Sequence, residues 1–373
     1  MHRTQCCSAW PFFGFWSHAC SCEGKNFVLK NRTLPEEMGL RAGIPVGTSL
    51  IDAHAGGVGI MESVPQSDSE AKGRFQLKVK IYQRYFISVT TLNEYLTEEF
   101  AFSFTLYLIL GAPINSYPSS ASSLDINFTP MFVAMLPEYW LTEGGQSATG
   151  ALLDYIIENH MASPHLADRA ASQKTSIFAL LNNMLLTMME EQKSPFVAAL
   201  TESTHVLPDF HGNRSPIADP KSKGIICGLT LDTSERQLAL LYLATIQGVA
   251  YGTRHIVEHC NAHGHEINTL LACGGLSKNP LYIQEHADIM GCPVILPRES
   301  ESVLLGAAIL GAVAAKKYPT VMEAMKALNV AGQVVRPSQD PKVKKYHDAK
   351  YRVFQELYEQ QLSQRSAMAK ALE

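Results

Sequence analysis

The spacing of apolar residues predicts alternating helices and strands from about residue 131 onward. Residues 178–189 repeat apolar side chains at helical spacing, and a long helix is predicted after residue 235. The side chains expected on the buried side of that long helix are Leu238, Leu241, Thr245, Val249, Ile256 and Cys260. Further predictions are helices over 146–159, 280–290 and 302–315, and strands over 224–231, 267–272 and 293–296. This alternation is typical of an α/β layered domain.

Some residues mark where these elements should begin and end. Asp232 with Glu235 three residues later predicts a capping box at the start of the long helix, and Gly264 is placed to end it. The helix over 302–315 is apolar nearly all round, so we expect it to be buried on every side.

Texture divides the chain into five segments. Residues 1–30 are aromatic and rich in cysteine, and residues 31–62 end in a Gly-rich run. Residues 63–130 show no clean period and read as an atypical insert or linker. Residues 131–335 form the predicted C-terminal domain, and a helical tail follows over 336–373.

Composition excludes several classes of protein. Apolar residues are 46% of the 373 and charged residues 18%, which excludes a wholly disordered chain and a coiled coil. A net charge of −4 gives no electrostatic footprint for nucleic acid or an anionic membrane. The most apolar run, residues 100–112, is shorter than the roughly 20 residues that cross a bilayer. We expect a cytoplasmic protein.

The eight cysteines fall into two groups. The cluster of Cys6, Cys7, Cys20 and Cys22 lacks the paired spacing of zinc sites and is interpreted as part of an ordinary tail. The others lie in apolar runs, where cysteine behaves as a small hydrophobic residue in a reduced setting; they are Cys227, Cys260, Cys273 and Cys292.

One candidate site is the segment from Cys273 to Pro280, between a predicted strand and a predicted helix. Gly274 and Gly275 allow a sharp turn and a close approach of the backbone to a ligand, while Ser277 and Asn279 offer polar groups near the helix N-terminus. On spacing alone, a tight turn capped by Asn is as good an interpretation as a nucleotide site.

A second candidate is Asp52, in what reads as a Gly-rich loop. Its carboxylate would suit a general base toward an alcohol, but a turn residue that bonds its own backbone is the favoured interpretation from the residues alone. His54 is interpreted as a structural hydrogen-bonding residue. The run Glu143–Ser147 reads as a loop that feeds a helix, where the paired glycines either approach a ligand or turn the chain.

Taken in order, several motifs resemble the FGGY carbohydrate kinases. They are Asp52-Ala53-His54, Glu143-Gly144-Gly145-Gln146-Ser147, Asn213-Arg214-Ser215-Pro216 and Gly274-Gly275-Leu276-Ser277-Lys278-Asn279-Pro280. The Ala250–Arg254 step and the Gly306-Ala-Ala helix look like the ribulokinase branch. The resemblance covers roughly residues 31–62 and 131–335.

The resemblance implies an actin-like (ribonuclease-H-like) ATPase fold of the sugar kinase superfamily, using ATP and Mg²⁺ on a small-molecule sugar. Asp52 matches the family's catalytic base, in a remnant of the first kinase domain over 31–62. The cofactor-binding residues implied by the motifs are Gly144, Gly145, Gln146, Gly274, Gly275, Ser277 and Asn279. No residue is assigned to a metal.

The sequence departs from the family before and after Asp52. In the family, an Asp-x-Gly-Thr turn precedes the base, and only about fifty residues, without that turn, precede Asp52 here. A second, Gly-Thr-Ser turn should lie between Asp52 and Gly145, but Gly47-Thr48-Ser49 precedes Asp52. We therefore expect a truncated or alternatively spliced form, with the N-terminal domain largely missing. The expected function is ATP-dependent phosphorylation of D-ribulose or a related ketopentose or pentitol. The alternatives are a non-catalytic nucleotide-binding or regulatory module and a product without function; a homo-oligomer also stays open.

Overall fold

A computed structural model describes residues 27–28, 45–47, 50, 52–63, 84–89, 105–113, 129–132, 136, 139–263, 265 and 267–373. The described elements, in chain order, are β1 (Phe27–Val28), β2 (Pro45–Val46), α2 (Asp52–Val58), β3 (Arg84–Val89), β4 (Thr105–Pro113), β5 (Thr129–Phe132), β6 (Tyr139–Ser147), α4 (Thr149–Glu158), α5 (Ser163–Ser172), α6 (Ile177–Glu191), the 3-10 helix η3 (Val197–Thr201), β7 (His205–Leu207), β8 (Ile225–Cys227), α7 (Glu235–Ala262), β9 (Leu270–Cys273), the 3-10 helix η4 (Gly275–Lys278), α8 (Pro280–Met290), β10 (Val294–Pro297), α9 (Ser302–Ala314), α10 (Val321–Leu328), β11 (Ala331–Val335) and α11 (Pro341–Leu372).

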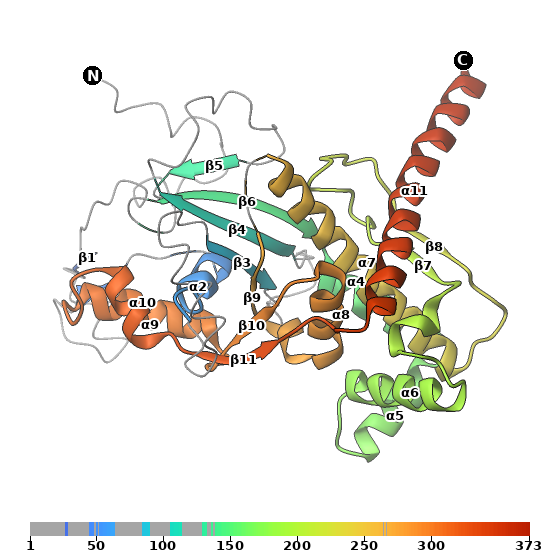
Figure 1. Ribbon diagram of the computed structural model, residues 1–373, viewed down its shortest axis with the longest axis horizontal. Coiled ribbons are helices and arrows are strands. Elements are labelled where there is room, and N and C mark those ends of the chain that lie inside the picture. The colour runs from blue at the N-terminus through green and yellow to red at the C-terminus, as the bar shows by residue number, and fades with distance from the viewer. Residues whose placement is uncertain are drawn as a thin grey trace.

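A seven-stranded mixed sheet organises these elements (Figure 1). Its strand order is β11-β10-β9-β3-β4-β6-β5. The inner strands β3, β9 and β10 run parallel to one another, and the remaining pairs are antiparallel. Two separate two-stranded sheets are formed by β1 with β2 and by β7 with β8.

The two faces of the sheet pack against different helices. Along β9, Leu270 and Ala272 join the core that contains side chains of α4, α5, α6, α7 and α8. Leu271 and Cys273 join a second core, which contains side chains of α2, α9 and α10. Because side chains alternate along a strand, the helices α2 and α8 therefore lie on opposite faces of the sheet.

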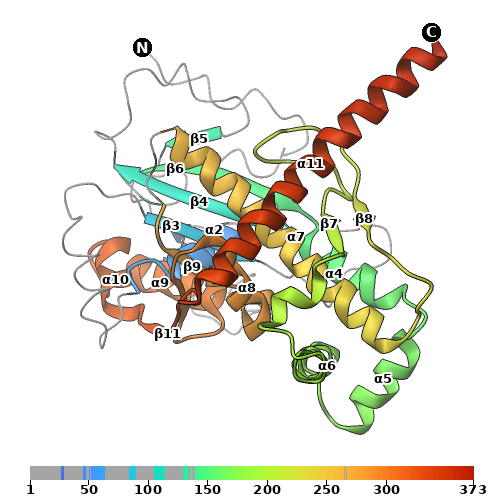
Figure 2. The same cartoon turned by 45° about the vertical axis from the view of Figure 1, so that its right-hand side comes forward.

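The helices predicted from apolar spacing are largely confirmed. The predicted helices over 178–189 and 280–290 correspond to α6 and α8, and α8 has the predicted bounds. All six side chains expected on the inner side of α7 are buried. The side chains of Cys260, Cys273 and Cys292 are buried, as expected of small hydrophobic residues, whereas that of Cys227 is half-buried. The helices α7 and α8 contact each other and both contribute side chains to the larger core (Figure 2).

The helix predicted to start at Gln146 begins three residues later, at Thr149. Gln146 and its neighbours do not form a loop: Glu143–Ser147 is the end of strand β6, where each residue pairs with β4. Ala148, in the left-handed conformation at φ 59°, turns the chain into α4. The glycines of this strand gave a loop signal that pairing with β4 overrides.

Two further expectations were wrong in detail. The N-cap of α7 is Ser234, whose side chain accepts a hydrogen bond from Gln237 N; Asp232 instead accepts from the backbone N–H of Ser234. Helix α9 is not buried on every side, because Leu304 is 67% exposed. Gly264 lies outside the described residues, and α7 ends at Ala262.

The zone read as an insert or linker, residues 63–130, contributes β3, β4 and the first half of β5 to the sheet; its other described residue is Ser63. The cluster of N-terminal cysteines lies outside the described residues. Helix α11 occupies most of the expected helical tail, and its first half packs through Tyr351, Phe354 and Leu357. Its last turns project away from the body of the molecule in both views (Figures 1 and 2).

Candidate functional site

The turn after β9 is built by glycine. Gly274 has φ 92° and ψ −177°, a conformation that a residue with a Cβ rarely adopts. Its carbonyl accepts a hydrogen bond from Ser277 Oγ at 2.6 Å, which closes the turn over the following 3-10 helix. Gly274, Gly275 and Ser277 are half-buried, so their backbone reaches the surface at the end of the strand.

Asn279 ends the turn and begins α8. Its Oδ1 accepts the backbone N–H of Leu281 at 3.1 Å, which makes it the N-cap, and Pro280 occupies the first helical position. The Asn279 side chain also lies in a set of hydrogen bonds that we call the amide ring, formed with Asn182 of α6 and Tyr242 of α7. The turn is thereby fastened to two further helices.

The amide ring has three bonds. Asn279 Nδ2 donates to the Tyr242 hydroxyl at 2.6 Å, and that hydroxyl donates to Asn182 Oδ1 at 3.1 Å. Asn182 Nδ2 donates back to Asn279 Oδ1 at 3.0 Å. Burial raises the pKa of the Tyr242 hydroxyl, so it stays protonated and remains a donor at neutral pH.

Gln146 is buried against α7. Its Nε2 donates to the carbonyl of Val249 at 2.9 Å and to Thr253 Oγ1 at 3.1 Å. Gly252 makes room for this amide: a Cβ there would lie 2.1 Å from Gln146 Oε1. The preceding Gly144 and Gly145 are buried in strand β6. Gln146 of the motif Glu143–Ser147 therefore contacts the ribulokinase-like segment Ala250–Arg254 directly.

A chain of contacts runs from Gln146 to α8. Thr253 Oγ1 lies 3.4 Å from His286 Nε2, and His286 Nδ1 lies 2.8 Å from the carbonyl of Tyr282. Burial lowers the pKa of His286 to about 4, so this histidine is neutral at physiological pH and its Nδ1–H donates to Tyr282. His286, Tyr282 and Ser277 line a small cavity directly behind the glycine turn.

Asp52 does not lie in a loop but begins helix α2, and its side chain lies outside what the structure describes. The helix tolerates Gly56 and Gly57 because it packs closely on α9. A Cβ on Gly59 would lie 1.9 Å from the carbonyl oxygen of Ser302, and a Cβ on Gly306 would lie 1.9 Å from that of Ala55. Tertiary contact thus overrides the low helix propensity of this segment.

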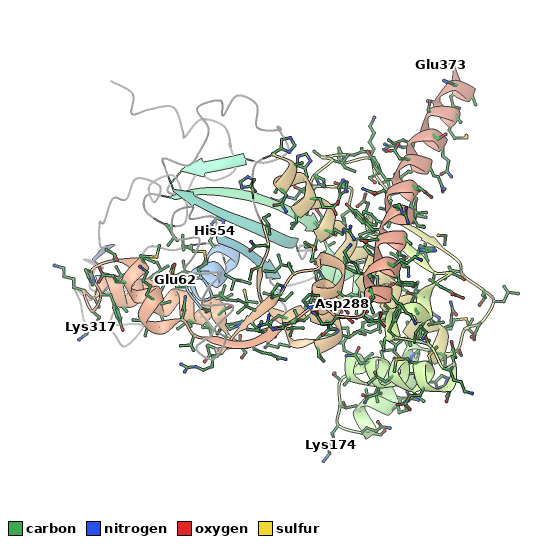
Figure 3. The ribbon with its side chains drawn as sticks, in the orientation of Figure 1. His54, Glu62, Lys174, Asp288, Lys317 and Glu373 are labelled. Atoms are coloured by element: carbon green, nitrogen blue, oxygen red, sulfur yellow. The ribbon has the colours of Figure 1, made fainter. Side chains whose placement is uncertain are left out.

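The C-terminal end of α2 is also held by one amide. Asn329 Nδ2 donates to the carbonyls of Val58 at 2.7 Å and Met61 at 2.5 Å. Helix ends leave such carbonyls without partners inside the helix. His54 and Glu62 mark the two ends of this segment in Figure 3, and both are buried.

The packing orients α2 relative to the turn. Gly59 lies beside Ser302 and Ala55 beside Gly306, so α2 and α9 run antiparallel. The turn contacts the start of α9 through the ion pair of Lys278 with Glu301, at 2.8 Å. The end of α2 at Gly59 is therefore the one nearer to the turn. Asp52 is at the opposite end of the helix, about 10 Å from Gly59 at a rise of 1.5 Å per residue.

A second buried polar group, the ionisable cluster, joins α8 to α11. Lys350 Nζ donates to the carbonyl oxygen of Thr201 and to Gln247 Oε1, both at 2.6 Å, and to Thr201 Oγ1 at 2.5 Å. Glu285 of α8 lies 4.0 Å from His347 of α11, measured from Oε2 to Nε2. Burial raises the pKa of Glu285 to about 8 and lowers that of Lys350 to about 7. These contacts attach the C-terminal helix.

The turn suits the uncharged part of a nucleotide better than its phosphates. Its polar groups are backbone amides, the Ser277 hydroxyl and the Asn279 amide, and its cation, Lys278, is paired with Glu301. Within the described residues, no group of three or more His, Cys, Asp or Glu side chains is arranged to hold a metal ion. Nor does any described helix have the length and apolarity of a membrane span.

Asn182 and Tyr242 were not among the residues singled out in the sequence. The signal was an amide in the apolar run Ile177–Leu186, and a tyrosine on the buried side of the long helix. Polar groups at such positions need hydrogen-bond partners, so their presence predicts a buried network without saying which residues complete it.

Comparison with protein families gives one match. Residues 116–315 match the model described as "FGGY family of carbohydrate kinases, C-terminal domain". Proteins named FGGY carbohydrate kinase domain-containing protein are 42% identical in Xenopus laevis, over 91% of this chain and 56% of the relative, and 43% identical in Homo sapiens, over 89% and 56%. A D-ribulokinase of Saccharomyces cerevisiae is 31% identical over 81% of this chain and 41% of its own length. The chain spans about half the length of the curated relatives it matches.

Solved structures of sugar kinases share the fold. A xylulose kinase from Brucella ovis superposes with a TM-score of 0.59 at 20% identity, covering 89% of this chain and 55% of that one. Plasmodium falciparum glycerol kinase with ADP superposes with a TM-score of 0.59 at 16% identity, covering 90% of this chain and 55% of the kinase chain. The mixed sheet with helices on both faces is thus the actin-like fold of the sugar kinases, as the resemblance predicted.

Proposed function

Because the chain belongs to the FGGY family of carbohydrate kinases, we propose that it binds an adenine nucleotide at the turn Gly274–Asn279 and takes part in phosphorylating a sugar hydroxyl. The observation that carries the proposal is the turn itself. Gly274 adopts a conformation suited to glycine at the end of a central strand, and the following helix N-terminus is capped by a buried amide. A solved relative by fold, the Plasmodium falciparum glycerol kinase, holds ADP.

In this proposal the chain supplies binding and positioning. Gly274, Gly275 and Ser277 line the adenosine, and Asn279 offers its amide to the base. Gly144, Gly145 and Gln146 belong to the end of β6 that packs against α7, and in this proposal that end of the strand lies beside the nucleotide. When bound, ATP with Mg²⁺ supplies the phosphoryl group and neutralises part of its charge.

Asp52 is the proposed general base. A carboxylate near a sugar hydroxyl can accept its proton as the oxygen attacks, and orientation of the alcohol is a major part of such catalysis. Asp52 is at the end of α2 that is farther from the turn Gly274–Asn279. Catalysis in this proposal therefore requires the phosphates and the sugar to extend from that turn along α2.

The proposed sugar is a ketopentose such as D-ribulose, or a related pentitol. The support is the 31% identity with a protein named D-ribulokinase.

The test measures ADP release from ATP and Mg²⁺ with D-ribulose, for the full chain and for Asp52→Asn. Turnover by the unchanged chain with a loss of at least about 100-fold in Asp52→Asn supports the base assignment, since a positioned base contributes roughly 10²–10⁴-fold. Full activity in Asp52→Asn would show that another group accepts the proton.

A second candidate function is a non-catalytic nucleotide-binding or regulatory module. The observation that favours it is that the turn is fastened by a complete ring of hydrogen bonds within the described residues, independently of α2. Titration with ADP separates the candidates: binding without turnover supports the module, and absence of binding overturns both.

A further inference from the structure

We propose that Asn182 and Tyr242 are positioning residues for nucleotide recognition: they hold Asn279 so that its amide presents one N–H donor, and no acceptor, to the base of a bound nucleotide. The inference rests on the proposed function, because it concerns the same turn. It adds to that function a selection rule for the base and two residues outside the turn that enforce it.

The helix cap fixes the orientation of the Asn279 amide. The backbone N–H of Leu281 donates to one end of the amide at 3.1 Å, and only the oxygen can accept it. The nitrogen therefore lies at the other end, 2.6 Å from the Tyr242 hydroxyl. A rotation of the amide by half a turn would place a donor against the N–H of Leu281.

This orientation decides the direction of the whole ring. The Tyr242 oxygen accepts from Asn279, so its own proton is directed to Asn182 Oδ1, 3.1 Å away. The amide of Asn182 then has its nitrogen toward Asn279 Oδ1, at 3.0 Å. Each group donates to the next in the same sense, an arrangement in which successive hydrogen bonds strengthen one another.

Counting the bonds shows what remains for a ligand. Asn279 Oδ1 receives two donors, Leu281 N and Asn182 Nδ2, which use both of its lone pairs. Nδ2 carries two hydrogens, and one is given to Tyr242. Among the described residues, no acceptor takes the second. A base at this turn therefore meets a donor and is recognised through a ring nitrogen or carbonyl oxygen.

The ring is placed to act on the turn and not only on helix packing. Asn279 is 8% exposed, whereas Asn182 is half-buried at the edge of the same set of side chains. The next residue along α6, Asn183, is exposed and its side chain takes no part in the ring. Asn183 is a matched control, since it has the same residue type on the same helix.

The experiment is calorimetry of the full chain with ADP and with ribose 5′-diphosphate, which lacks the base. Asn182→Asp keeps the size of the side chain but turns an acceptor toward Asn279 Oδ1, and Tyr242→Phe removes the hydroxyl. We expect ADP to bind about tenfold more weakly to each variant, the effect of losing one well-placed hydrogen bond. Ribose 5′-diphosphate should bind equally to the variants and the unchanged chain.

Asn183→Asp adds the same negative charge one residue away and should leave the affinity for ADP unchanged. Equal weakening of both ligands by Asn182→Asp would overturn the proposal, because the effect would then be charge or loss of structure. So would an unchanged affinity for ADP in both ring variants. Failure of the unchanged chain to bind ADP has a different meaning: it overturns the proposed function itself.

Discussion

The two features of the candidate site are attached to the molecule in different ways. The turn Gly274–Asn279 is held by side chains, through the amide ring and, further along α8, through the ionisable cluster. Helix α2, which begins with Asp52, is held by backbone against backbone at Gly59 and Gly306, and by the single amide of Asn329.

The difference predicts how each attachment responds to change. Side chains can rotate or exchange partners, so each substitution in the amide ring should weaken the attachment of the turn by a moderate amount. Backbone atoms in contact cannot move without shifting a whole helix, so α2 should respond abruptly to added volume. The ring and the cluster also differ from each other, since only the cluster contains groups that titrate near neutral pH.

The largest effect is expected from Gly306→Ala. The new Cβ would lie 1.9 Å from the carbonyl oxygen of Ala55, which belongs to the backbone of α2 and cannot rotate away. We expect a loss of about 3 kcal/mol in the free energy of unfolding, measured by urea titration. Gly311→Ala is the matched control on the same helix, because a Cβ there meets nothing within 4 Å, and it should gain up to about 1 kcal/mol. Equal effects of the two would refute backbone contact as the attachment.

Asn329→Ala should weaken the same helix by a smaller amount. The substitution leaves the carbonyls of Val58 and Met61 without their amide donor in a buried setting. The expected loss is about 2 kcal/mol, with faster hydrogen exchange along α2 and unchanged exchange in α8. Faster exchange in both helices would mean that the two attachments are not independent.

Changing pH should separate the ionisable cluster from the amide ring. Burial raises the pKa of Glu285 to about 8 from an ordinary 4.5, so the folded state holds a proton that the unfolded state releases as pH rises between these values. The stabilisation that this proton gives is fully present below pH 4.5 and is lost as pH rises toward 8.

The measurement compares unfolding free energies of the unchanged chain and Glu285→Gln at several pH values. Relative to Glu285→Gln, the unchanged chain should lose stability progressively between pH 4.5 and 8, because only the carboxyl group gives up a proton in this window. Parallel curves across this window would show that Glu285 is ionised in the folded state.

The elements that apolar spacing predicted well are those whose neighbours lie nearby in the sequence or whose caps are local. Helix α8 has the predicted bounds because Pro280 and Gly291 mark its ends directly. Helix α2 was missed because its glycines look like a loop until Gly306, which is distant in the sequence, is placed against Ala55 and Gly59. The strand that ends at Ser147 was missed for a similar reason, since β4 comes from a zone without a readable period.

The candidate site divides in the same way. The turn at Gly274–Asn279 can be predicted from its own residues, because the glycines that form it and the asparagine that caps the next helix lie within a few positions of one another. The partners that fix Asn279 lie 97 and 37 residues away in the sequence, on helices whose relative placement no local pattern predicts. The motif residues could therefore be read from the sequence, whereas Asn182 and Tyr242 required the fold.

The smallest effect is expected from Tyr242→Phe, and its independence of pH is the sharper part of the prediction. The substitution leaves Asn279 Nδ2 and Asn182 Oδ1 without their shared partner, at a loss of about 1 kcal/mol in the free energy of unfolding. Because burial raises the pKa of this hydroxyl, it carries its proton throughout the range in which Glu285 titrates. The difference between Tyr242→Phe and the unchanged chain should therefore be the same at pH 5 and pH 8 in urea titrations. A difference that follows the Glu285 curve would mean that the ring and the cluster are one coupled network along α8 and not two separate attachments.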